Sequence, residues 1–377
     1  MTASAGREIT PETFSEQEPD IATIRELARL SGVSVATVSR VLNDYSDVSP
    51  ATRERVLEVA RELDYTPSAA ARTLVMQRSK VIGVLLETGE GHPDLQHPFF
   101  QEVLVGLKHR LGAAGYDLLL FATENPGNGF SEHSYVRRAR HHRVDGLVLM
   151  GMDPAEDEVQ KLVKARIPLV AVDAELVGGR SGFVISDNLG GARLAVRHLR
   201  QQGHDRIATL TGILSTRPGA DRLLGYRAEL EAQGLPYRDD YVQEGDFYFE
   251  SGRRGMNALL ALPEPPTAVF AAGDLMAAGA LRAVEEHGLS VPGDIALVGF
   301  DDIQLAAMMQ PSLTTVRQDK MGLGSSAGEA LLRMLDEADS APPITTLPVE
   351  LVVRESSGAQ RPHTRAQKPR DGEVAGP

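Results

Sequence analysis

The stretch GVSVATVSRVLN, residues 32–43, decides the fold of the N-terminal part of the chain. Its apolar residues Val38 and Val41 recur at the spacing of one helix face, which predicts that this face packs against neighbouring helices. The other face carries Ala36 and Arg40, a small and a cationic residue with no bulky neighbour. The pattern therefore predicts a helix with one buried face and one unobstructed face.

Two further helices are predicted on either side of this one. The first lies near residues 23–30, and the third starts after Ser49, a good N-cap residue followed by proline, and runs to about Leu63. Gly32 can take the positive φ of a tight turn. Two helices joined in this way are typical of a helix-turn-helix, whose second helix enters the DNA major groove. A small helical bundle with no DNA role is the alternative.

The amino-acid composition indicates the class of protein but does not decide whether the protein binds DNA. The 377 residues contain no cysteine and carry a net charge of −13. The charge is uneven: residues 1–20 hold one Arg against five acids, and residues 21–80 hold nine Lys or Arg against seven acids. The first twenty residues show no basic start followed by an apolar run, the pattern of a signal peptide. No apolar run reaches the about 18 residues needed to span a membrane. We therefore expect a soluble, cytoplasmic protein with a slightly basic module on an acidic body.

From residue 80 onward, short apolar runs alternate with helix-length segments. Examples are VIGVLL at 81–86, PLVAVD at 168–173 and IALVGFD at 295–301. Near-continuous apolar strands separated by helices indicate parallel sheets covered on both faces. The predicted fold is an all-α helix-turn-helix headpiece followed by an α/β core of two doubly wound parallel-sheet lobes, like a periplasmic binding protein. The expected boundaries are a disordered leader at 1–20, the headpiece at 21–66, a hinge helix or linker at 67–79, the two-lobed effector-binding and dimerisation core at 80–357, and a disordered tail at 358–377.

Residues 24–75 resemble the headpiece of the lactose/galactose repressor (LacI/GalR) family. The resemblance rests on ELARLSGVSVATVSRVLN and VSPATRERVLEVARELDYTPSAAARTL. Residues 80–356 resemble the family's sugar-binding-protein-like core through HPFF, DRLLGYRAEL, VPGDIALVGFDD and LTTVRQD. The resemblance implies a homodimeric transcriptional regulator, a repressor, that binds a pseudo-palindromic operator and answers to a small-molecule effector, with a sugar expected.

The resemblance also implies which residues contact DNA. Val35, Ala36 and Arg40 match base-reading positions, and side-chain chemistry agrees, because arginine can pair with guanine and small apolar groups can contact a thymine methyl. Within PSAAARTL, Leu74 matches a leucine that wedges into the minor groove; a plain core leucine is the alternative. The full set of expected DNA contacts is Ser34, Val35, Ala36, Thr37, Ser39, Arg40, Ala71 and Leu74.

A second set of residues matches the family's effector contacts. Arg222 is expected to bind effector oxygens, Asp301 to accept hydroxyl hydrogens and Phe247 to stack on a ring. The alternatives are surface ion pairs or helix caps for the charged residues and core packing for the Phe pair. In the loop where the family usually has Asn-Asp, this chain has Gly273-Asp274, which puts the usual ligand geometry in doubt. The expected effector residues are Phe99, Phe100, Asp173, Ile185, Arg222, Phe247, Asp274, Asp301 and Gln318, with Ser186 and Asp187 as further candidates.

Other functions are weighed against this one. The sequence shows no nucleotide-binding glycine loop, P-loop or H-E-x-x-H pattern, so neither an enzyme nor a cofactor or metal site is expected. The basic run RRARHHR at 137–143 is interpreted as a solvated helix face rather than a metal site or a second DNA surface. A purine or another metabolite could replace the sugar, since a purine could also stack on Phe247. A sugar-binding transport module is the remaining alternative.

Overall fold

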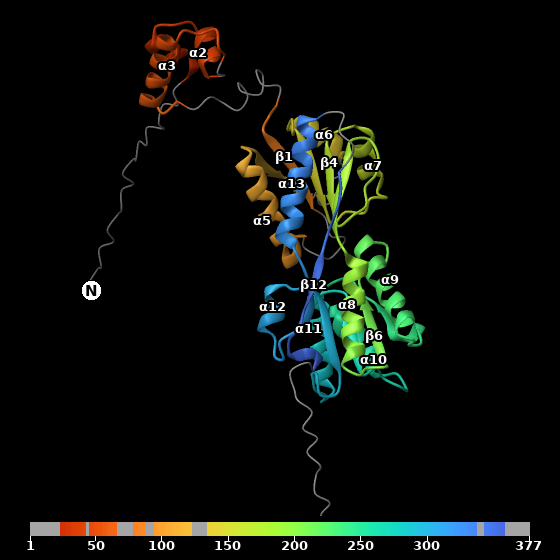
Figure 1. Cartoon of the computed structure of the whole chain (residues 1–377). Helices are drawn as coiled ribbons and strands as arrows, with labels where there is room; N and C mark the ends of the chain where they lie inside the picture. The colour runs from red at the N-terminus through yellow and green to blue at the C-terminus, as the bar shows by residue number, and fades with distance from the viewer. Residues whose placement is uncertain are drawn as a thin grey trace, which may run out of the picture. The chain divides into compact units, whose positions relative to one another are not determined.

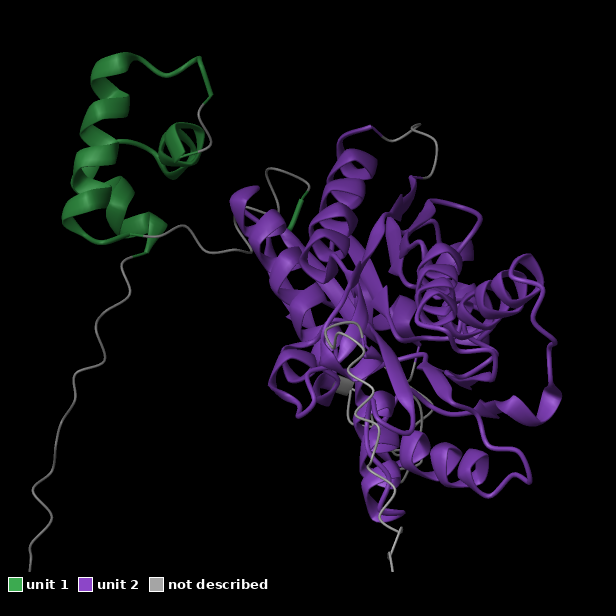
Figure 2. Ribbon diagram, turned by 60° about the horizontal axis from the view of Figure 1, so that its bottom comes forward, with its two compact units in different colours: residues 1–79 green, residues 80–377 purple. Residues whose placement is uncertain are grey.

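The computed structural model describes residues 23–42, 45–65, 78–86, 94–122, 134–337 and 343–358. The chain divides into two compact units, residues 1–79 and residues 80–377 (Figure 2). The expected leader, the expected tail from residue 359 onward, the hinge positions Ala71 and Leu74, and residues 87–93 lie outside the described residues. No helix in the described part of the chain is both long enough and apolar enough to cross a membrane.

The first unit contains three short helices around one apolar cluster. They are α1 (Ile24–Ser31), α2 (Val35–Leu42) and α3 (Pro50–Glu62). Gly32 ends α1 with φ at 64°, so the predicted tight turn is confirmed. Ser49 caps α3 by accepting from the backbone N–H of Thr52, also as predicted. Val38 and Val41 are buried in the cluster, which fixes the face that α2 turns outward.

The second unit begins with a six-stranded parallel sheet, which we call the N-terminal lobe. Its strand order is β11-β5-β4-β3-β1-β2, and every neighbouring pair is parallel. The helices α5 (Pro98–Ala113), α6 (Tyr135–His141), α7 (Asp157–Lys164) and α13 (Lys320–Asp336) belong to this lobe (Figure 1). The strands are β1 (Val81–Leu86), β2 (Asp117–Leu120), β3 (Gly146–Met150), β4 (Leu169–Val172), β5 (Ser181–Ser186) and β11 (Ile344–Leu347).

A second six-stranded sheet forms the C-terminal lobe. Its order is β12-β10-β9-β8-β6-β7, parallel except that β12 runs antiparallel to β10. The helices are α8 (Asn188–Gln201), α9 (Arg217–Ala232), α10 (Phe249–Leu260), α11 (Asp274–Glu286) and α12 (Gln304–Met308). The strands are β6 (Ile207–Thr211), β7 (Val242–Glu244), β8 (Ala268–Ala271), β9 (Ala296–Asp301), β10 (Thr314–Gln318) and β12 (Val349–Val352). The two predicted doubly wound lobes are thus confirmed.

The chain crosses between the lobes at three points. β5 continues into α8, β10 continues into α13, and β11 continues into β12 (Figure 1). The first two crossings leave from the carboxyl ends of parallel strands, the place where ligands bind in open α/β sheets. Asp187 and Asp319 cap the two helices that follow by accepting from backbone N–H groups. The crossings therefore bring the strand ends of both lobes together.

Candidate functional site

The outward face of α2 is a candidate nucleic-acid interface. Val35 and Ala36 are exposed in its first turn, and Arg40 is exposed one turn later. The Ser34 Oγ accepts from the backbone N–H of Thr37 at 3.1 Å and so caps the helix N-terminus. Small side chains at the N-terminal end with a cation behind them suit a helix that enters the major groove.

Arg40 has a partner within the first unit. Its Nη1 lies 3.2 Å from Asp47 Oδ2, and both side chains are more than half exposed, at 59% and 53%. An exposed pair of this kind contributes at most about 1 kcal/mol and is screened by salt. The guanidinium is therefore easily transferred from Asp47 to another acceptor, such as a guanine edge.

A second site forms around Arg222 in α9, where the lobes meet. The guanidinium is almost fully buried and donates to Asn188 Oδ1 at 2.9 Å and to the carbonyl of Ala272. It also stacks on the ring of Phe300, with 3.7 Å to the ring centroid. Burial lowers the pKa of Arg222, while the nearby carboxylate of Asp301 raises it. This environment holds a cation in a fixed orientation away from bulk water.

Asp301, the last residue of β9, faces Arg222. Its Oδ1 lies 3.7 Å from Arg222 Nη1 and accepts from Gln318 Nε2 at 2.6 Å. Among the described residues, its Oδ2 accepts no hydrogen bond. A Cβ added to Gly273 would lie 3.6 Å from that Oδ2 and 3.8 Å from the Phe247 ring. The glycine therefore leaves room for about one methyl group between this carboxylate oxygen and the aromatic ring.

Asp173 follows β4 and brings a second carboxylate from the N-terminal lobe. Burial raises its pKa to about 6, Arg222 lowers it and Asp301 raises it. Hydrogen bonds from the Ser186 backbone and the Asn188 side chain also lower this pKa, and Asn188 accepts from Arg222, so Asp173 belongs to the same cluster. The side chain is partly exposed as a whole, but its Oδ1 is enclosed and has no hydrogen-bond partner among the described residues.

Several other buried polar atoms of this region lack partners within the described part of the chain. They come from both lobes and lie at or next to strand ends. In native proteins buried polar groups are nearly always paired, so a group of such atoms needs an explanation. The atoms are Ser186 Oγ, Thr211 Oγ1 and Gln318 Oε1, in addition to Asp173 Oδ1.

The backbone is also unusual here. Asp173, Phe247 and Asp301 have positive φ values of 59°, 73° and 114° although none is a glycine. Such conformations cost about 1–3 kcal/mol and cluster at ligand sites. Three of the residues that the sequence singles out as effector contacts therefore hold strained conformations at strand ends.

Other expected effector residues have structural partners. Asp274 is fully buried, and its two oxygens accept from the backbone N–H of Ile303 and from Thr315 Oγ1. Burial raises its pKa well above the usual value. Asp187 caps α8, which is the alternative that the sequence left open. Phe99 and Ile185 are buried in the two apolar clusters of the N-terminal lobe, and Phe100 packs against the first of them.

Sequence reasoning missed the groups that join the lobes. His97 caps α5, and its ring packs edge-on against Tyr248 of the C-terminal lobe with centroids 5.4 Å apart. Burial lowers the pKa of His97, while the charge of Asp301 raises it. Lys320, the first residue of α13, donates to the carbonyl of Asp301 at 2.7 Å. His97 stands in the quoted HPFF motif, but only the fold reveals its partner across the lobes.

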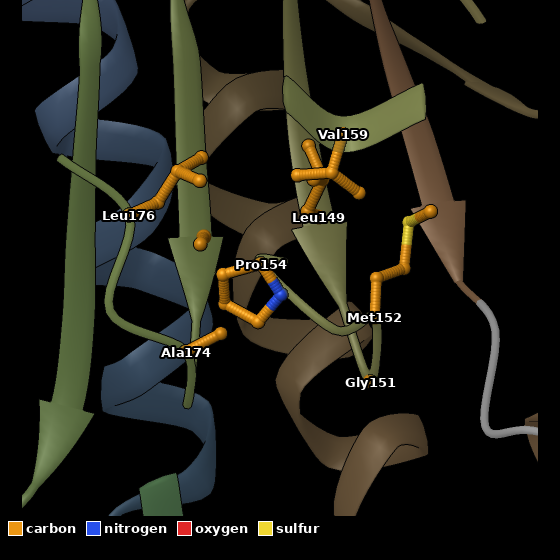
Figure 3. A pocket seen from close by; sticks show the side chains of 8 residues that line it. Leu149, Gly151, Met152, Pro154, Val159, Ala174 and Leu176 are labelled. Atoms are coloured by element: carbon orange, nitrogen blue, oxygen red, sulfur yellow. The ribbon is translucent and has the colours of Figure 1, made fainter. Parts of the chain in front are cut away.

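An apolar pocket lies nearby but does not fit a metabolite. It sits at the carboxyl ends of β3 and β4, is lined by residues such as Leu149, Pro154 and Leu176, and measures about 10 Å³ (Figure 3). That volume is about one water molecule, far below the several hundred Å³ of small-molecule sites. In the described ranges, no group of three or more His, Asp or Glu side chains could hold a metal ion.

Comparisons with known proteins show which family the chain resembles. Residues 23–68 match the model of bacterial regulatory proteins of the lacI family, and residues 196–357 match the periplasmic binding protein-like domain. The HTH-type transcriptional repressor PurR of Actinobacillus pleuropneumoniae serotype 3 (strain JL03) is 34% identical over 89% of this chain and 98% of that protein. The ribose operon repressor of Escherichia coli (strain K12) is 37% identical over 84% of this chain and 94% of that protein.

Solved structures give the same result. A lac repressor dimer bound to operator and the anti-inducer ONPF superposes with a TM-score of 0.75 at 30% identity, covering 89% of this chain and 99% of that one. A complex of the transcriptional regulator CelR with cellobiose gives a TM-score of 0.68 at 32% identity over 89% of this chain. With relatives above 30% identity along nearly its whole length, the chain belongs to the lacI family of bacterial regulatory proteins.

Proposed function

We propose that the chain is a sequence-specific transcriptional regulator, a repressor, whose affinity for operator DNA changes when a small molecule binds between its lobes. The observation that carries this proposal is the pairing of two sites in one chain. One is the exposed face of α2 with Arg40, and the other is the buried cluster around Arg222 with its partnerless polar atoms. The division into a headpiece at 21–66, a hinge at 67–79 and a core at 80–357 is part of the proposal.

DNA reading is assigned to the second helix of the headpiece. Arg40 would give a bidentate pair to guanine, while Val35 and Ala36 would contact apolar base edges. Ser34, Thr37 and Ser39 would contact phosphates and set the position of the helix. Because one half-site gives limited affinity, we propose a homodimer on a pseudo-palindromic operator. The lac repressor structure, described as a dimer bound to operator, supports this arrangement.

The free atoms of the interlobe site favour a ligand rich in hydroxyl groups. Asp173 Oδ1, Asp301 Oδ2 and Gln318 Oε1 are acceptors, and the hydroxyls of Ser186 and Thr211 can accept as well. A sugar supplies many O–H donors and a ring face that can lie on Phe247. A purine or another metabolite is the second candidate, supported by the same ring and by the similarity to the repressor PurR.

Contacts across the lobes provide the means of control. Arg217 of α9 forms an ion pair with Glu175 after β4, and His97 packs on Tyr248. A ligand that binds one lobe arrangement better than another shifts the population towards it. By linkage, operator DNA must then change ligand affinity by the same factor. We propose that the chain has no enzymatic activity and works in the cytoplasm, where its DNA is.

A selection experiment tests the function. The chain is used to select duplexes from a random pool, and the selected duplex is titrated with and without each of a panel of monosaccharides and purine bases. A thermal-shift screen of the same panel identifies the ligand, since binding to the folded state raises its stability. A chain that selects no sequence and binds no duplex at low salt would contradict the proposal.

A further inference from the structure

The basic run at 137–143 lies at one edge of the N-terminal lobe, in α6 and the turn that leads to β3. The strands of this lobe are parallel, so all of them begin at one edge, and α5, α6, α7 and α13 end there. β1 begins at this edge directly after the segment that connects it to the headpiece. The Lys80 backbone N–H donates to Asp145 Oδ2 at 3.0 Å, and the Asp145 N–H donates to the Val81 carbonyl at 2.9 Å. We call this the linker edge.

Four exposed cations occupy neighbouring places on the linker edge. Arg140 is in the last turn of α6, and Arg143 stands two residues before Asp145 in the turn leading to β3. Lys164 ends α7, and Arg166 lies in the turn leading to β4. Because β4 pairs with β3 and β3 pairs with β1, these turns lie on adjacent strand starts about 5 Å apart.

None of the four cations is neutralised by a carboxylate of the described residues. This differs from the C-terminal lobe, where Arg193 and Arg197 both bind Glu229 and Arg238 binds Asp240 and Glu264. The acids of α7 lie at its opposite end, in the first turn. The carboxylates present at the linker edge itself are Asp117, Asp145, Asp336 and Glu337. With Lys80 and Arg180, which directly precede β1 and β5, the described residues of this edge include six cations against these four carboxylates, so the edge is net positive.

Helix dipoles explain part of this pattern, because cations are favoured at helix C-termini. They do not explain the backbone of Arg143 and Arg166. The helices α5, α8, α9 and α11 are each followed by a glycine in the left-handed region, at Gly115, Gly203, Gly234 and Gly288. After α6 and α7 the corresponding left-handed residues are Arg143 and Arg166, with φ at 52° and 57°. A long side chain is uncommon there, and glycine takes the conformation without cost.

In place of the solvated helix face expected from the sequence, we propose that the linker edge is a second DNA-contacting surface, on which Arg140, Arg143, Lys164 and Arg166 bind backbone phosphates of the DNA held by the headpiece. This inference rests on the proposed function. Residues 66–77 can extend over at most about 40 Å, so the chain tethers the linker edge to the headpiece that holds the DNA. A chain with net charge −13 would repel DNA if it approached with an acidic face. The cations of the linker edge would instead attract DNA phosphates that come within a Debye length of about 8 Å.

The test removes two of these cations without straining the fold. Arg143→Gly and Arg166→Gly are combined in the whole chain, and binding to a mixed-sequence duplex of about 40 base pairs is measured by fluorescence anisotropy between about 50 and 200 mM salt. Each protomer of the proposed homodimer loses two phosphate contacts, so the slope of log affinity against log salt should fall by about 4 for the dimer. The thermal midpoint should stay the same or rise, since glycine suits both positions.

A matched control removes the same charge at a distance. Arg206, just before β6, and Arg254 in α10 are exposed residues of the C-terminal lobe, and the control combines Arg206→Gln with Arg254→Gln. Its salt slope should equal that of the wild type. Equal slopes in the wild type and the Arg143→Gly, Arg166→Gly variant would overturn the linker-edge contact while leaving the proposed function intact. An equal reduction of the salt slope in both variants would also overturn the linker-edge contact, because it would show that DNA responds to the overall charge of the chain. Failure of the wild type to bind DNA would instead refute the proposed function.

Discussion

Replacing Arg222 by lysine tests whether the interlobe site depends on the guanidinium geometry or only on its charge. Arg222 donates to Asn188 and to the Ala272 carbonyl while it faces Asp301 and stacks on Phe300. An ammonium keeps the charge but cannot reach these acceptors together, because it lacks the planar fork of donors. At least one buried acceptor is then left without its charged donor.

The expected cost of Arg222→Lys is about 2–3 kcal/mol in the free energy of unfolding, the value of one hydrogen bond to a charged group. Urea unfolding followed by far-UV circular dichroism measures this cost. Arg282→Lys is the control, since Arg282 is 58% exposed and its ion-pair partners in the described part of the chain are Glu285 and Glu286 of its own helix. That change should cost less than about 0.5 kcal/mol. A loss below about 1 kcal/mol for Arg222→Lys would refute the idea that the fork organises the site.

Three other substitutions have distinct expected results. Arg40→Ala should weaken binding to the selected duplex by about 1–3 kcal/mol and remove discrimination at one guanine. Titration of duplexes with single base changes measures both effects. Unchanged discrimination would contradict base reading by Arg40. The pKa of Asp173, about 6 in the folded state and about 3.9 when unfolded, means that ionisation destabilises the fold increasingly as pH rises from 4 through 6. The wild type should therefore lose about 1 kcal/mol relative to Asp173→Asn between pH 5 and pH 7 in urea unfolding, and parallel pH profiles would show that this carboxyl is not perturbed. Gly273→Ala should change the free energy of unfolding by less than about 0.5 kcal/mol, because the added Cβ makes only ordinary contacts. It should weaken ligand binding about tenfold in calorimetry if the ligand occupies the space beside Asp301. An unchanged affinity would show that the ligand does not use that space.

Local features of the fold could be predicted from the sequence because their causes are local. The tight turn at Gly32 and the cap at Ser49 depend on residues within one helical turn of each other. The apolar strands of both lobes were likewise visible as runs, because strands covered on both faces carry apolar residues continuously. The buried face of α2 followed from the spacing of Val38 and Val41 alone.

Features that depend on distant segments could not be predicted in this way. His97 acquires its role from Tyr248, and Arg222 is oriented by Asn188, in each case across the chain and between separate elements. Asp274 resembled its neighbours at the strand ends, but its oxygens are taken up by Ile303 and Thr315. No local pattern distinguishes a carboxylate that holds the backbone from one that faces a ligand.

The central claim is that DNA and a small molecule are bound at two separate sites that influence each other. The measurement that tests it most directly is the affinity of the whole chain for its best ligand, determined by calorimetry with and without a saturating amount of the selected duplex. If the two sites are coupled, the duplex changes ligand affinity by the same factor as the ligand changes duplex affinity, about 5- to 150-fold. Equal ligand affinities in the presence and absence of the duplex would contradict it.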